Sequence, residues 1–167
     1  MSVKKNKYRG KLKNKRTQHP RCIGREWAFQ FLFQLDLTAD SQDFENSFKL
    51  FKEQLEENPT RPKDSVFEPG LEFCNELCSG VVKHLEELDK MIVKYAKNWT
   101  IDRMPIVDRN LLRMSFFELN FIEETPKVVA INEAVQLAKT YSEADSPKFI
   151  NGLLDKFYQE CLAEEAK

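Results

Sequence analysis

A lysine and a phenylalanine stand side by side near the end of the chain, in the stretch DSPKFINGLLDK at residues 145–156. If this stretch is a helix, Ile150 and Leu154 belong to its apolar stripe, and Phe149 lies roughly 80–100° from the centre of that stripe. A ring at the edge of a core can stack on a base of single-stranded RNA while the ammonium of Lys148 meets a phosphate. The same ring can equally be a peripheral part of the core, so the residues alone leave both interpretations open.

The neighbours of this pair are also polar or small. Gly152 lies one turn after Phe149 and removes side-chain bulk there, so either another helix or an RNA backbone could come close. Asn151 has no apolar role and is expected to hold a neighbouring backbone or to cap a helix end. Asp145 precedes a Ser-Pro pair, which predicts a helix start with a capping oxygen followed by proline in the first turn.

The basic residues are concentrated at the N-terminus. Residues 1–25 contain ten Lys or Arg and no Asp or Glu, which leaves 16 basic and 27 acidic residues in the rest of the chain. A basic arm on an acidic body favours a polyanion such as nucleic acid as the partner of the arm, and a merely solubilising tail is the alternative. Because residues 1–20 have almost no apolar content, we expect them to form a disordered arm.

Sequence patterns typical of enzymes and metal sites do not occur. The chain has two histidines and no HExxH, P-loop, GxGxxG or GxSxG motif. The spacing of Cys22, Cys74, Cys78 and Cys161 is not that of a zinc knuckle, so we expect reduced thiols in a cytoplasmic protein. No apolar run approaches the roughly 20 residues of a membrane span, and no signal peptide is recognisable. We therefore expect a binding protein without catalytic residues, metal or cofactor, and not an enzyme.

Apolar residues at three- and four-residue steps predict helices throughout the body of the chain. The expected helices cover residues 24–38, 43–57, 68–95, 105–122, a segment after Pro126, and 147–161, with a short turn from residue 100. The longest one contains Ser79-Gly80, which allows a kink or a close helix crossing. The predicted fold class is all-α, with a single helical domain at 21–162 between the arm and a tail at 163–167.

Four blocks of sequence resemble the NusB family of bacterial transcription antitermination factors. They are GREWAFQFLFQLDL at 24–37, PIVDRNLLRMSFFEL at 105–119, PKVVAINEAVQLAKTY at 126–141 and DSPKFINGLLDK at 145–156. Their order and spacing match the family over about residues 20 to 160. The resemblance implies two packed three-helix sub-bundles with about seven helices in all. It also implies binding of the boxA element of ribosomal RNA leader transcripts together with NusE, a protein of the small ribosomal subunit, in an RNA polymerase antitermination complex.

The resemblance further implies which residues bind RNA: Arg21, Arg25, Asp145, Lys148, Phe149 and Asn151. The Lys-Phe positions face RNA in the family, which favours the stacking interpretation of Phe149 over the core one. Cys22 and Ile23 stand where arginine or lysine is common, so this chain departs from the family at the arginine cluster before the first helix. The lysines further upstream can supply electrostatic affinity without base readout.

Three residues are expected to bind the protein partner. Phe33 occupies an aromatic position on the first helix, where tyrosine is frequent in the family. Asp102 and Asp108 occupy acidic positions before the central helix, where pairing with basic residues of a ribosomal protein would favour specificity. Both acids also begin helices, where negative charge is favourable without any partner.

Two other classes of function remain open at this point. A protein-only adaptor or a homodimeric helical module would bind a ribosomal protein without specific RNA recognition, and the altered positions 22 and 23 are compatible with it. An enzyme related to the RNA methyltransferases that carry a NusB-like domain is disfavoured, because the chain has no cofactor-binding βαβ unit.

Overall fold

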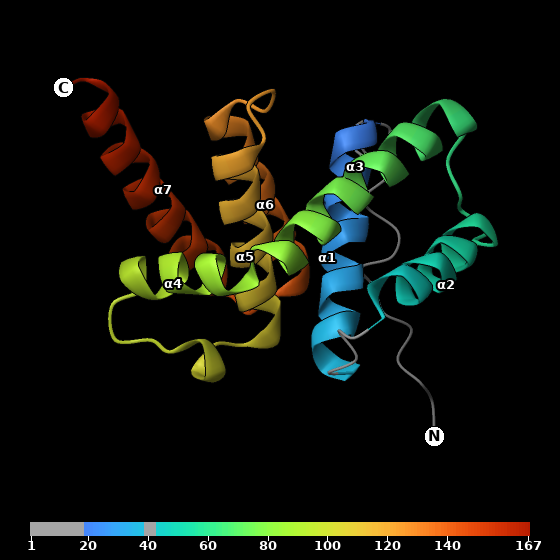
Figure 1. The fold of residues 1–167 in the computed structure, drawn as a ribbon, viewed down its shortest axis with the longest axis horizontal. Helices are drawn as coiled ribbons and strands as arrows, with labels where there is room; N and C mark the ends of the chain where they lie inside the picture. The colour runs from blue at the N-terminus through green and yellow to red at the C-terminus, as the bar shows by residue number, and fades with distance from the viewer. Residues whose placement is uncertain (1–18, 39–42) are drawn as a thin grey trace.

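The structure of the protein is a computed structural model that describes residues 19–38 and 43–167 (Figure 1). Over these residues it contains seven α-helices, one short 3-10 helix and no β-strand, which confirms the predicted all-α class. The helices are α1 Pro20–Thr38, α2 Phe44–Glu56, α3 Asp64–Lys83, α4 Leu85–Tyr95, η2 Ile101–Arg103, α5 Ile106–Phe121, α6 Lys127–Tyr141 and α7 Ser146–Glu165.

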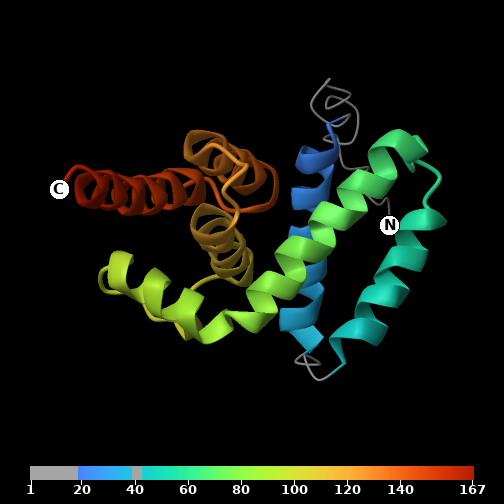
Figure 2. The ribbon, with the colours of Figure 1, turned by 45° about the horizontal axis from the view of Figure 1, so that its top comes forward.

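The helices pack as two sub-bundles, with α2 on the outer side of the first and α7 on the far side of the second (Figure 2). In the first sub-bundle, formed by α1, α2 and α3, the ring of Phe31 lies 5.2–5.6 Å from the rings of Phe44, Phe48 and Phe51. The second consists of α5, α6 and α7 with the short α4 as an additional helix. Helix α5 joins the two, because it packs against α1 and α3 as well as against its own sub-bundle.

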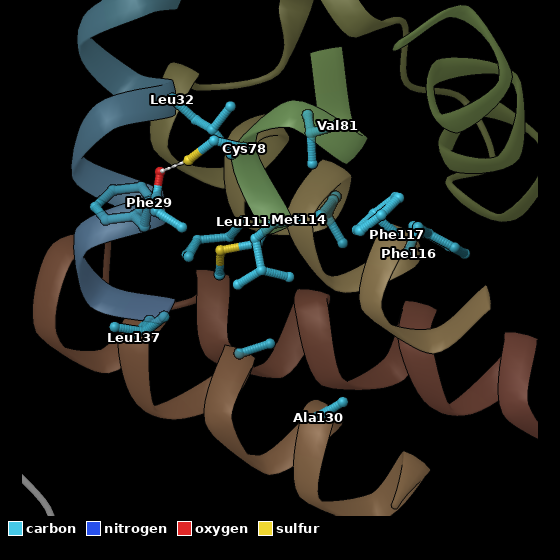
Figure 3. Packing of buried hydrophobic residues seen from close by; sticks show 14 of the residues in the cluster. Phe29, Leu32, Cys78, Val81, Leu111, Met114, Phe116, Phe117, Ala130 and Leu137 are labelled. Carbon is cyan, nitrogen blue, oxygen red and sulfur yellow. Dashed lines mark hydrogen bonds between the residues drawn. The ribbon is translucent and has the colours of Figure 1, made fainter. Parts of the chain in front are cut away.

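The shared core lies where α1, α3, α5 and α6 meet (Figure 3). Leu111 and Met114 of α5 are at most 1% exposed and face Leu32 of α1 there. The Sγ of Cys78 on α3 donates a hydrogen bond to the carbonyl oxygen of Ala28 at 3.7 Å. Burial raises the pKa of this thiol, so it behaves as a small apolar core residue.

The long helix predicted at 68–95 is two helices. Helix α3 begins at Asp64, and the chain leaves helical geometry at His84, with φ −107° and ψ 19°, before α4 begins. The break lies four residues after Gly80, so this glycine does not produce it. A Cβ at Gly80 would lie 1.9 Å from Cζ of Phe117, which means that the glycine provides the close crossing of α3 and α5.

The other predicted helix boundaries agree with the structure to within a few residues. Residues 1–18 of the predicted arm lie outside the described residues. Helix α7 continues to Glu165, past the expected end of this helix at residue 161, and includes the first residues of the segment 163–167 that was predicted as a tail. In the described part of the chain no helix combines the length and the apolarity that a membrane span requires.

Candidate functional site

The start of α7 is held by a buried carboxylate from another helix. Asp108 of α5 is 4% exposed, and it accepts hydrogen bonds from Ser142 and from Ser146, the latter at 2.8 Å. Asp145 has the N-cap position, as the sequence predicts, but it has helical backbone angles, and no N–H of the described first turn donates to its side chain. The predicted capping oxygen is therefore absent, and Asp108 fixes the position of the turn instead. Asp145 is left exposed at the helix N-terminus.

The exposed residues at the start of this helix follow Phe149 round one side of it, in a sector of about 160°. With 100° per residue, Gly152 and Lys148 are turned by about 60° and 100° from Phe149 to one side, and Asn151 lies further round on the same side. All three are exposed, whereas Phe149 is half-buried at the border with the core. Its ring contacts Trp99 at a centroid distance of 6.2 Å and an interplanar angle of 52°. The sector combines an aromatic face, an ammonium and an amide on a fixed helix.

Gly152 is open to solvent. Apart from its chain neighbours and the backbone of its own helix, no heavy atom of the described chain lies within 4 Å of the position that a Cβ would occupy. The expectation that another helix crosses closely at this glycine is therefore wrong for the described residues. The other expectation, that a ligand backbone approaches here, is still a prediction.

The two arginines predicted to bind RNA serve contacts inside the protein. Arg25 is 2% exposed; its Nε donates to Oε2 of Glu118 at 2.9 Å and its Nη2 donates to Oε1 at 2.5 Å. Burial alone would lower the pKa of Arg25, but the hydrogen bonds and the charge of Glu118 outweigh it and raise the pKa above its ordinary value. The half-buried Arg21 donates to Oγ1 of Thr125 at 2.7 Å, and its guanidinium lies 4.9 Å from the ring centroid of Phe73. Arg25 therefore positions α1 against α5, and its predicted RNA contact is still a prediction.

The structure also separates these arginines from the α7 surface. Arg25 contacts α5 at Glu118, whereas the start of α7 contacts α5 at Asp108. These two positions are ten residues apart on one helix, and a rise of 1.5 Å per residue separates them by about 15 Å. The six predicted RNA-binding residues therefore form two groups rather than one cluster.

The residues predicted to bind the protein partner differ in accessibility. Phe33 is half-buried and lines a shallow pocket together with Gln30, Gln34, Val107 and Tyr141. Asp102 is exposed on η2. Asp108 is buried and holds the start of α7, so it has a positioning role, and its predicted partner contact is still a prediction.

A polar network that the sequence did not reveal fixes the geometry between the sub-bundles. Asp36 of α1 accepts two hydrogen bonds from Arg109 at 2.7 and 2.8 Å and one from Asn110 at 2.8 Å. Arg113 donates to Asp89 of α4 at 2.7 and 2.8 Å. Asp36 and Arg109 are 73 residues apart, so no local spacing could have indicated this pair.

A second missed contact involves Tyr141, at the end of α6. Its hydroxyl donates to Glu26 of α1 and accepts from Nε2 of Gln30 at 3.1 Å. Burial and the neighbouring carboxylate of Glu26 raise the pKa of Tyr141, so the hydroxyl keeps its proton and serves as a donor. These two hydrogen bonds of Tyr141 fix one wall of the pocket that Phe33 lines.

Residues 23–159 match the model of the NusB family. The chain belongs to the NusB family. A transcription antitermination protein NusB from Elusimicrobium minutum is 42% identical over 141 residues, which cover 84% of this chain and 94% of the relative. This membership confirms the expectation of a binding protein rather than an enzyme.

Solved NusB structures share the fold. A NusB structure from T. maritima has a TM-score of 0.71 at 30% identity, covering 86% of this chain and 93% of that chain. A crystal structure of the antitermination factors NusB and NusE in complex with dsRNA has a TM-score of 0.68 at 33% identity, covering 84% of this chain and 97% of that chain. The arrangement of two packed sub-bundles is therefore that of the NusB family.

Proposed function

We propose that this protein is an RNA-binding transcription antitermination factor that binds the boxA element of ribosomal RNA leader transcripts together with NusE. The observation that carries the proposal is the surface of α7 on which Phe149, the open Gly152 and the exposed Lys148 follow one another round the helix, with the exposed Asn151 beyond them. Membership in the NusB family and the relative solved with NusE and dsRNA support it. The site of action is the cytoplasm, where RNA polymerase synthesises the leader transcript.

In this proposal each exposed residue of the sector has a separate role. The ring of Phe149 stacks on an unpaired base, an interaction that accepts any base and is worth roughly 1–3 kcal/mol. The ammonium of Lys148 meets a phosphate, and the amide of Asn151 can donate to and accept from a base edge. Asp145 opposes phosphate at the edge of the sector and limits how tightly nonspecific RNA binds. Arg21 and Arg25 hold α1 in place, and the basic residues before them add electrostatic attraction.

The protein partner is proposed to bind beside the Phe33 pocket. The half-buried ring of Phe33 offers apolar area, and the exposed Asp102 offers a carboxylate for a basic residue of NusE. Recognition is then composite: the factor and NusE share the RNA, so neither protein alone needs high affinity. The assembled pair acts on RNA polymerase to promote read-through.

The test is fluorescence anisotropy with a boxA RNA and a scrambled RNA, each with and without NusE, at two salt concentrations. The expected result is preference for boxA that increases when NusE is added. Phe149→Ala should weaken this binding by roughly 1–3 kcal/mol while the melting temperature stays close to that of the wild type. Binding that ignores sequence and disappears at the higher salt would show that only nonspecific charge is engaged.

One observation favours a second candidate, the protein-only adaptor or homodimeric module. Arg21 and Arg25 are engaged inside the protein, and the chain beyond residue 25 is strongly acidic. An adaptor would bind NusE with an affinity that survives removal of residues 1–20, and it would bind boxA RNA negligibly even together with NusE. Sedimentation of the protein alone and with NusE separates a homodimer from a one-to-one adaptor.

A further inference from the structure

Trp99 is an exposed aromatic residue that packing does not explain. It follows Asn98, which has a left-handed φ of 69°, and its N–H donates to the carbonyl oxygen of Ala96 at 3.1 Å. This tight turn after α4 holds the indole at the surface, where it is 45% exposed. The other tryptophan, Trp27, is 8% exposed in the core. A large ring fixed at the surface by a strained turn is a feature expected of a binding site.

The indole lies against the ring of Phe149. The ring centroids are 6.2 Å apart and the planes are tilted by 52°, so the two rings meet at an angle and no base fits between them. Each ring therefore keeps an outer face of its own. Two tilted faces side by side can accept two neighbouring bases of a strand that bends between them.

We propose that Trp99 and Phe149 together form a platform that stacks two neighbouring bases of single-stranded RNA, and that the strand continues along α7 over Gly152. The inference rests on the proposed function, since it extends the same RNA surface. It adds Trp99 as a base-stacking residue and gives the strand a direction along α7, away from the arginines of α1.

Gly152 supports this direction because its backbone is accessible. It lies about 60° round the helix from Phe149 and one turn further on, and no other element of the described chain comes within 4 Å of its missing Cβ. Glycine in a helix costs about 1 kcal/mol relative to alanine. Packing gives no reason for that cost here, whereas a ribose or phosphate lying on the helix backbone would give one.

Charge along the path is mixed rather than uniformly basic. Lys148 and Lys156 are exposed in the same sector of α7, as are Asp145 and Asp155. Further along, the carboxylate of Glu160 accepts a hydrogen bond from the hydroxyl of Tyr95 at 2.7 Å and forms an ion pair with the ammonium of Lys94 at 3.5 Å. With the nearby charges almost balanced, stacking has to supply most of the affinity, so the contribution of the platform should depend little on salt.

Trp99→Ala is the decisive variant. It should weaken binding of boxA RNA roughly 5- to 150-fold, the equivalent of losing one stacked base, and the loss should persist at the higher salt. The matched control is Phe121→Ala, which removes an aromatic ring of similar exposure, 41%. Phe121 is the last residue of α5, whereas Trp99 precedes the start of that helix. The RNA affinity of this control should equal that of the wild type. Equal affinities of the Trp99→Ala variant and the wild type would overturn the platform.

Gly152→Ala tests the path independently of folding. Alanine favours the helix, so the melting temperature should stay the same or rise, while RNA affinity should fall because the new methyl group blocks the backbone. A variant with unchanged affinity would overturn the path over Gly152.

Measurement with the scrambled RNA separates this inference from the proposed function. A wild type that binds both RNAs equally would contradict boxA recognition. Because stacking is sequence-tolerant, a loss of affinity for both RNAs in the Trp99→Ala variant would still support the platform. A wild type that binds neither RNA, with or without NusE, would overturn both.

Discussion

Replacing Arg25 by methionine should strongly destabilise the protein. The side chains of Arg25 and Glu118 are 3% and 2% exposed, and two of the hydrogen bonds between them measure 2.9 and 2.5 Å. A second carboxylate, that of Glu133, lies 3.9 Å from Nη1 of the same guanidinium. Removing the arginine leaves the Glu118 charge buried without its partner, which costs about 3–5 kcal/mol. A domain has only about 5–15 kcal/mol of stability in total.

Urea unfolding followed by far-UV circular dichroism measures this loss directly. In a thermal scan the same loss corresponds to a fall in melting temperature of about 6–20 °C, since 1 kcal/mol shifts a domain of this size by about 2–4 °C. The double variant Arg25→Met with Glu118→Leu is the control. It removes both charges, so it should recover much of the stability that the single variant loses.

RNA binding by the same variant decides between the two roles of Arg25. At a temperature where Arg25→Met is folded, its affinity for boxA RNA should be close to that of the wild type, because the guanidinium does not reach the surface. A stability loss below about 1 kcal/mol, the range of exposed ion pairs, together with a clear loss of RNA affinity, would refute the positioning role and restore the predicted RNA contact.

Three further predictions concern the positions that shape the fold. Gly80→Ala places a Cβ against the ring of Phe117 and should cost about 1–3 kcal/mol, measured as a fall in melting temperature; an unchanged value would mean that the ring moves aside freely. Burial would raise the pKa of Asp36, but the hydrogen bonds from Arg109 and Asn110 outweigh burial and lower this pKa. The stabilisation that the Asp36 carboxylate contributes is therefore complete above about pH 4, and it disappears as the pH falls through the lowered pKa. Asp36→Asn should therefore lower the urea midpoint at pH 7, and the difference from the wild type should shrink below pH 4; a constant difference would contradict this. Asp108→Ala should lower the melting temperature, whereas Asp102→Ala should leave the melting temperature unchanged and weaken only NusE binding. The reverse result would mean that Asp102 stabilises the fold and Asp108 binds NusE.

The sequence by itself determined the helical class and most of the helices. Apolar residues at three- and four-residue steps specify one buried face for each helix, and this signal is local. The arrangement of sub-bundles was predicted only through the resemblance of four sequence blocks to a family. Phe149 at the edge of the α7 stripe was also predictable, because 100° per residue places it there without knowledge of any neighbour.

Tertiary structure decided which charged residues are buried. Asp102 and Asp108 look equivalent in the sequence, yet one is exposed and the other accepts hydrogen bonds from two serines that follow it by 34 and 38 residues. Arg25 reads as part of a basic segment, but Glu118, 93 residues away, turns it into a core residue. Charge in a sequence is a property of one residue, whereas its burial depends on partners that only folding brings within hydrogen-bonding distance.

The same reason explains the two glycines. Gly80 and Gly152 both interrupt a helical pattern, and a close approach was possible at either one from the sequence; only the structure shows that Gly80 lies against Phe117 while Gly152 faces open space. A missing side chain leaves no periodic signal, so its purpose depends on whatever approaches from outside the helix. The sequence thus determined where the backbone is helical, and the packing between helices determined which surfaces are left for RNA and protein partners.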